Sequence, residues 1–119
     1  MKRFFIIAAL ILCFCSTAFA GPDFVKHSTK TSSALVTSGS GLYHGIKVNT
    51  DGTNAATITI YDNTEESGST VDPQTVYVTS STIRVQASGS NPPRRYYNGL
   101  YVSISCSGTV SVTVEYVPD

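Results

Sequence analysis

The sequence predicts an all-β fold, a single small antiparallel β-sandwich of jelly-roll or immunoglobulin-like type with about seven strands. Ser and Thr account for 29 of the 99 residues after position 20, whereas Leu, Lys and Glu, which favour helices, are scarce. Short β-branched runs alternate apolar with polar residues and recur about every 8 to 15 residues, separated by turn-forming clusters. These runs predict strands at residues 33–37, 42–49, 56–62, 75–79, 82–87, 99–105 and 109–117.

Each predicted strand has one apolar side, because successive side chains of a strand point to opposite faces. A sandwich buries these sides between its sheets. The Asp51-Gly52 pair tolerates positive φ and predicts a hairpin turn between the strands at 42–49 and 56–62. The predicted core positions are Leu42, His44, Ile46, Val48, Ile58, Ile60, Val76, Val78, Ile83, Val85, Ala87, Leu100, Val102, Ile104, Cys106, Val110, Val112, Val114 and Tyr116.

The first twenty residues have the pattern of an export signal. Lys2 and Arg3 form a basic start, residues 4–15 are apolar, and Ala18 and Ala20 precede a cleavage position before residue 21. The apolar run is shorter than the roughly 20 residues that cross a bilayer as a helix. We therefore expect a signal peptide at 1–20, an N-terminal arm at 21–32 and a sandwich domain at 33–119. The expected location is secreted, extracellular or periplasmic, with no stable membrane insertion after cleavage.

Cleavage would change the charge and the cysteine count of the chain. Residues 21–119 carry six basic and eight acidic side chains, a formal net charge of minus two. Such a balance argues against a nucleic-acid partner. Of the three cysteines only Cys106 remains, so no disulfide can form within one chain, and its apolar neighbours predict a buried thiol.

The residues that carry most enzyme chemistry are few, and we expect a non-enzymatic protein with no catalytic residue, no metal and no cofactor. The two histidines are His27 in the polar arm and His44 on the predicted inward side of a strand. We interpret His44 as a structural residue and not as a catalytic base. Zinc-type spacing of Cys and His is missing from the sequence. The acidic segment from Asp62 to Asp72 has two interpretations, a loop whose carboxylates are simply solvated and a loop that binds calcium.

Tyrosines are the residues that the core pattern does not absorb. Tyr43, Tyr61, Tyr77 and Tyr101 all occupy the outward phase of their predicted strands, among Thr and Ser. One interpretation is cross-strand packing on a solvated sheet. The other is a contact surface, because Tyr offers a large rigid area and a hydroxyl group.

A second candidate contact region follows a Pro-Pro pair. Arg94, Arg95, Tyr96 and Tyr97 place cations and aromatic rings side by side, a composition enriched in interface hot spots. Because the net charge is slightly negative, a protein or glycan surface is a better match than nucleic acid. A loop that only covers one end of the sandwich is the ordinary alternative.

Two longer stretches resemble a known family. Residues 38–63, SGSGLYHGIKVNTDGTNAATITIYDN, and residues 97–116, YNGLYVSISCSGTVSVTVEY, are similar to the first and last segments of small β-sandwich proteins in the structural gene clusters of tailed phages. The resemblance implies a virion module for head decoration or for tail or fibre assembly, often a symmetric oligomer, and it brings no catalytic residues. Tailed-phage virion proteins assemble in the cytoplasm, so the export signal is a departure from the family. Either a phage-type module acts at the cell surface or the likeness reflects shared β-sandwich chemistry.

From these observations we expect a secreted or surface structural or interaction module that resembles phage virion proteins. The predicted partner is a protein or glycan surface, contacted by the outward tyrosines and the segment 94–97, and self-association is open. The location would be the virion if the phage interpretation holds. The alternatives are a small carbohydrate-binding or adhesin-like module and a subunit of an extracellular filament, in which an arm or an edge strand adds to a neighbour's sheet.

Overall fold

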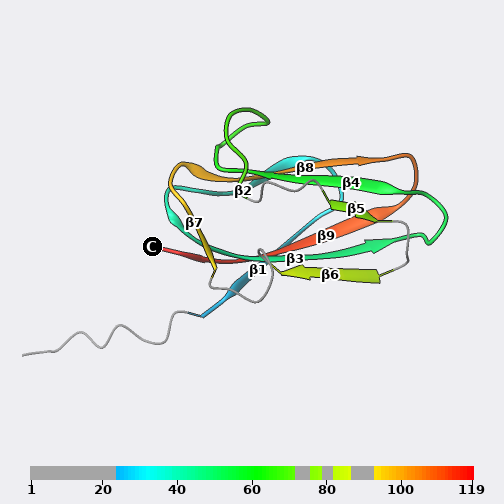
Figure 1. Cartoon of the computed structure of the whole chain (residues 1–119), viewed down its shortest axis with the longest axis horizontal. Coiled ribbons are helices and arrows are strands. Elements are labelled where there is room, and N and C mark those ends of the chain that lie inside the picture. The colour runs from blue at the N-terminus through cyan, green and yellow to red at the C-terminus, as the bar shows by residue number, and fades with distance from the viewer. Residues whose placement is uncertain (1–23, 72–75, 79–81, 87–92) are drawn as a thin grey trace, which may run out of the picture.

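A computed structural model describes residues 24–119 except 72–75, 79–81 and 87–92, and it confirms the predicted all-β sandwich (Figure 1). The export signal predicted at 1–20 and the last residue of the acidic segment, Asp72, lie outside the described residues. The described part contains nine strands rather than about seven. They are β1 (Lys26–Lys30), β2 (Ala34–Ser38), β3 (Gly41–Thr50), β4 (Ala56–Tyr61), β5 (Val76–Val78), β6 (Thr82–Gln86), β7 (Arg94–Tyr96), β8 (Gly99–Cys106) and β9 (Val110–Pro118).

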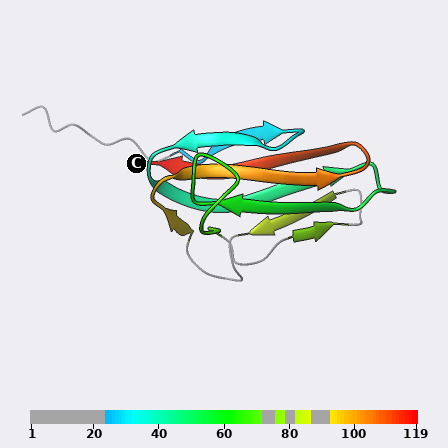
Figure 2. The same cartoon turned by 90° about the horizontal axis from the view of Figure 1, so that it is seen from above.

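The strands form two stacked antiparallel sheets. Sheet A has the order β1-β9-β3-β6, and β7 also pairs with β3. Strands β6 and β7 lie one after the other along the same edge of β3, since β6 pairs with residues 45–49 and β7 with residues 41–43. Sheet B has the order β2-β8-β4-β5. Figure 2 shows β1 and β2 along one side of the sandwich and β5 and β6 along the other.

The pairing identifies the sandwich as a jelly roll. Strand β1 pairs with β9, β2 with β8, β3 with β6 and β4 with β5, so the chain is a long hairpin rolled into two sheets. With β6 and β7 taken as one interrupted strand, this is the eight-strand jelly-roll pattern. The topology therefore decides between the two sandwich types that the sequence leaves open.

The core lies between the sheets and contains most of the predicted residues. Leu100, Val102, Val112 and Val114 are fully buried, and Ile104 and Cys106 are half-buried against the same cluster. The predicted core positions on β5 and β6, and Ala87, have side chains outside the described residues. The buried hydrophobic side chains are Tyr43, Ile46, Val48, Ala56, Ile58, Ile60, Val71, Tyr96, Leu100, Val102, Val110, Val112, Val114, Tyr116 and Val117.

A β-bulge in β3 overturns the prediction for Tyr43. Tyr43 pairs with Tyr116 on β9 and Gly45 pairs with Glu115, so His44 is the extra residue. An extra residue reverses the side-chain phase of the strand that precedes it. Tyr43 is therefore buried, at 1% exposure, whereas His44 is only half-buried. The φ of Gly45 is 142°, in a region that side-chain-bearing residues rarely adopt.

Two local predictions differ from the structure. Residues 26–30, expected within an arm, form β1 at the edge of sheet A. Gly52 has the positive φ, 79°, expected of its turn, but the turn does not close a hairpin. It joins β3 of sheet A to β4 of sheet B, as a jelly roll requires.

Candidate functional site

The outer face of sheet B carries a row of apolar side chains across three strands. Leu35 on β2 pairs with Tyr101 on β8, and Tyr101 pairs with Tyr61 on β4. Residues directly opposite each other on adjacent strands place their side chains on the same face, about 5 Å apart at Cβ. Leu35 is 41% exposed and both tyrosines are half-buried. We call these three residues the apolar row.

Beyond the apolar row, the outer face of sheet B carries cross-strand pairs of polar residues. Ser103 pairs with Thr59, and Ser105 pairs with Thr57. Tyr77 on β5 pairs with Thr57 through its backbone, but its side chain lies outside the described residues. This face thus has an apolar row at one end and hydroxyl groups beside it.

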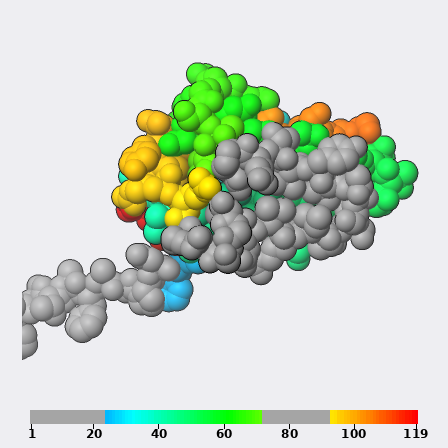
Figure 3. All heavy atoms as spheres, viewed as in Figure 1, coloured from blue at the N-terminus to red at the C-terminus, as the bar shows by residue number. Residues whose placement is uncertain are grey.

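The loop at residues 62–70 folds over part of this face. Its two ends are held together by a hydrogen bond from the Asp62 amide to the Ser69 carbonyl at 2.8 Å, and Thr70 bridges to Tyr61. From the loop, Glu66 Oε1 accepts a hydrogen bond of 2.6 Å from the Ser103 hydroxyl, two residues along β8 from Tyr101. Figure 3 shows this loop (green) as a protrusion above the body of the sandwich. The loop therefore places a carboxylate beside the apolar row.

The outer face of sheet A has a different chemistry. Lys47 is exposed between the buried Ile46 and Val48, and its partner on β9 is Thr113. His27 Nδ1 on β1 lies 3.9 Å from Glu115 Oε1 on β9. The described part of this face is mostly polar and mixed in charge, and its apolar pair is the half-buried Leu42 opposite the buried Val117. The apolar row of sheet B differs in spanning three strands and in including the exposed Leu35.

The segment 94–97 is not the exposed cluster that the sequence predicts. Residues 94–96 form β7, and Tyr96 is fully buried. Gly41, opposite Tyr96, allows this burial, because a Cβ there would collide with the Tyr96 ring and with the Val117 carbonyl oxygen. Arg94 is half-buried opposite Tyr43. The prediction that Tyr43 and Tyr96 form a binding surface is therefore wrong, since both belong to the core.

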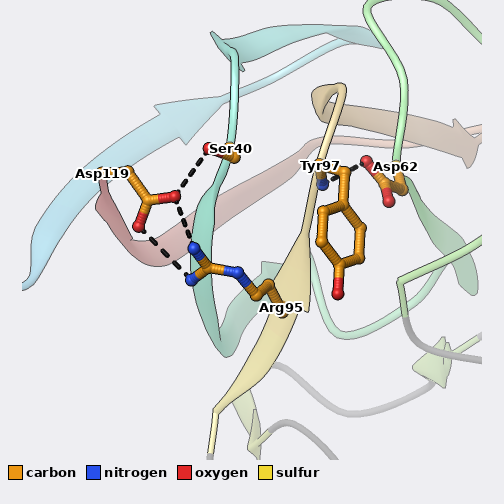
Figure 4. A network of polar contacts seen from close by, with 5 residues as sticks. All are labelled: Ser40, Asp62, Arg95, Tyr97 and Asp119. Carbon is orange, nitrogen blue, oxygen red and sulfur yellow. Dashed lines mark hydrogen bonds and ion pairs between the residues drawn. The ribbon is translucent and has the colours of Figure 1, made fainter.

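Arg95 is engaged within the chain. Its guanidinium is 2.8 Å from Asp119 Oδ2, and the same oxygen accepts a hydrogen bond of 2.6 Å from Ser40 (Figure 4). The Asp119 amide also donates to the Ser40 carbonyl at 3.0 Å. These contacts fasten the end of β9 to β7 and to the β2–β3 corner, which favours a structural role for Arg95.

Tyr97 is the one member of this segment with a largely exposed ring, at 66%. Asp62 Oδ1 holds its backbone by accepting hydrogen bonds from the amides of Tyr97 and Asn98, at 2.9 and 2.7 Å. Figure 4 shows the ring pointing away from the Arg95–Asp119 pair. Because Asp62 directly follows Tyr61, the exposed Tyr97 belongs to the same end of the molecule as the apolar row.

The acidic side chains of the described residues act mainly as internal acceptors. Asp51 Oδ1 accepts from the Thr53 and Asn54 amides, and its Oδ2 accepts from the Asn54 side chain and the Thr109 amide. These hydrogen bonds, those from Asn54 above all, hold the pKa of the Asp51 carboxyl well below its usual range. Within residues 24–119, gaps apart, no group of three or more His, Cys, Asp or Glu side chains could hold a metal ion.

Sequence reasoning missed two parts of this surface. Leu35 lies in a predicted strand, but only the register with β8 shows that it continues a row with Tyr101. The contact between Glu66 and Ser103 joins residues 37 positions apart, and no local pattern signals it. The outward orientation predicted for Tyr61 and Tyr101 is confirmed, since the alternating Ile58, Ile60, Leu100 and Val102 are all buried.

In comparisons with protein-family models, with curated proteins and with solved structures, no match to this chain was found. Among the described residues, no helix is long and apolar enough to cross a membrane.

Proposed function

We propose that the protein is a non-enzymatic structural or interaction module that contacts its partner through the outer face of sheet B. The observation that supports this most is the apolar row, Leu35–Tyr101–Tyr61, which spans three strands of sheet B and includes the exposed Leu35, while the described outer face of sheet A is mostly polar. Exposed apolar surface that spans several strands is a common feature of contact sites. Rigid tyrosine rings contribute contact area at low entropy cost.

The favoured setting is that of a small virion-type module outside the cytoplasm, after removal of residues 1–20. The resemblance of residues 38–63 and 97–116 to tailed-phage β-sandwich proteins supports this setting, as does the jelly-roll topology, which recurs in viral capsid domains. Topology supports such a role only by analogy, because one fold serves many functions.

The test is whether the protein co-purifies with phage particles and whether this association depends on the apolar row. Particles from a culture that expresses the protein are purified on a density gradient, and the bound chain is quantified by mass spectrometry. We expect co-purification, and loss of it for Tyr101→Thr, since Thr suits an outer sheet position and should preserve the fold. Lys47→Thr on the outer face of sheet A is the matched control and should bind like wild type. Wild-type chain found only free of particles would contradict the virion role.

A carbohydrate-binding role is the second candidate. Tyr61 and Tyr101 form a pair of adjacent rings, and Glu66 beside them is fixed by Ser103 at 2.6 Å. Adjacent rings next to a carboxylate suit a sugar, because its apolar face can pack on the rings and its hydroxyl groups can donate hydrogen bonds to the carboxylate oxygens. Binding on a glycan array that Tyr61→Thr abolishes and Lys47→Thr preserves would favour this candidate over the virion module.

A further inference from the structure

The two adjacent edge strands, β1 and β2, differ in how they are protected against pairing with another chain. Both are terminal in their sheets, and they lie on the same side of the sandwich (Figure 2). An edge strand exposes unpaired backbone donors and acceptors, and proteins commonly block them with charges, proline or inward-pointing lysines.

Strand β1 carries such protection. Lys26 pairs with Tyr116 and Lys30 with Val112, both of which face the core, so the two lysines occupy the inward phase of an edge strand. A second strand placed beside β1 would have to desolvate these charges. The sequence of β1, KHSTK, therefore disfavours strand addition.

Strand β2 has almost no such protection against strand addition. Its sequence, ALVTS, contains no charged residue and no proline, and its second residue, Leu35, is 41% exposed. Among the described residues no strand pairs with its outer side. Its one protective feature is the β-bulge between Leu35 and Thr37, which shortens the regular edge without closing it.

We propose that β2 is a strand-addition site whose occupant is β2 of a second copy of this chain. In the register that places Leu35 opposite its own copy, two chains paired antiparallel through β2 would join their B sheets into one continuous sheet and bring the two Leu35 side chains into contact across the axis. Neither strand brings a charge to the junction, so no like-charge repulsion opposes it. This proposal concerns the edge of sheet B and does not depend on the partner of its outer face.

The contrast between the edges also predicts where assembly stops. A twofold contact occupies β2 in both copies, and β1 beside it remains blocked by its lysines, so growth through this side of the sandwich stops at the dimer. Five residues a side are fewer than the 20–30 of a standard interface. We therefore expect a weak dimer, with a dissociation constant above about 1 μM.

Sedimentation velocity of the purified protein from micromolar to millimolar concentration tests the proposal. We expect a reversible monomer–dimer equilibrium that Leu35→Lys abolishes. Thr29→Lys, which adds the same charge to β1, is the matched control and should leave the equilibrium unchanged. A monomer at every concentration, or a dimer that Leu35→Lys leaves intact, would overturn the proposal.

Two further measurements keep the test independent of one substitution. Amide hydrogen exchange of the wild type should slow in β2, and not in β1, as concentration rises. Protection of β2 that appears only when another protein or peptide is added would reject the homodimer. Replacing both β1 lysines, Lys26→Thr with Lys30→Thr, should permit species larger than the dimer, and their failure to form would overturn the closure argument.

Discussion

Replacing Tyr96 by Phe is expected to stabilise the domain. Tyr96 is fully buried, and its hydroxyl has no hydrogen-bond partner among the described residues. An unsatisfied buried polar group costs about 1–3 kcal/mol, and Phe keeps the ring that fills the space above Gly41. A gain of about 1 kcal/mol would raise the Tm by roughly 4–8 °C in a domain of this size. Thermal unfolding followed by circular dichroism at neutral pH measures the shift.

The matched control is Tyr97→Phe. Its ring is 66% exposed, so the free energy of unfolding should change by less than about 0.5 kcal/mol. A Tm for Tyr96→Phe below that of the wild type would show that the hydroxyl makes a stabilising hydrogen bond, and would refute the claim that this buried group is unsatisfied.

Tyr96 is also expected to make the folded protein less stable in alkali. Burial, with smaller contributions from Tyr116 and Asp119, raises the pKa of Tyr96 from 10.0 to about 12. Between these values the unfolded chain releases a proton that the folded chain retains, so this contribution is complete below pH 10 and is lost as the pH rises toward 12. The loss is at most about 3 kcal/mol. Urea unfolding across this range should show a steeper decline for the wild type than for Tyr96→Phe, and equal slopes would contradict the assignment.

Three further substitutions test the contacts around the site. Gly41→Ala forces a methyl group against the Tyr96 ring and should destabilise the fold by about 1–3 kcal/mol in urea unfolding. Asp51→Asn should lower the free energy of unfolding at neutral pH. Because the pKa of Asp51 is depressed in the folded protein, the wild type should lose its greater stability over this variant as the pH falls from about 4. A stability difference that persisted in acid would contradict the hydrogen-bond assignment. Arg95→Ala removes an exposed ion pair with Asp119 and should cost less than about 1 kcal/mol, with a smaller effect at high salt; a larger, salt-independent cost would indicate that packing dominates.

The fold could be predicted from the sequence because most strands alternate strictly. In β9 every second residue from Val110 to Tyr116 is buried, and the same holds for Ile58 and Ile60 in β4. Alternation reports which face of a strand is apolar, so it predicts a sandwich and its core without knowledge of strand order. The order itself depends on pairing between distant residues, which is why the jelly roll emerged only from the structure.

The candidate site was predicted in part, for physical reasons that particular residues make clear. Tyr61 and Tyr101 lie on regular strands, so their outward orientation follows from phase. The orientation of Tyr43 does not follow from phase in this way, because the bulge at His44 reverses the side-chain phase within one strand. Tyr96 is buried because Gly41 leaves room for its ring, a contact between residues 55 positions apart that composition cannot reveal.

The central claim, that the outer face of sheet B is the contact surface, is tested most directly by oxidative footprinting. The protein is labelled in the particle or cell-surface fraction where it is found and, separately, as purified protein, and modification is quantified by residue. The account predicts that Leu35, Tyr61 and Tyr101 are protected in the assembled fraction, while Lys47 on the outer face of sheet A is modified equally in both. Protection of sheet A with an unchanged apolar row would contradict it.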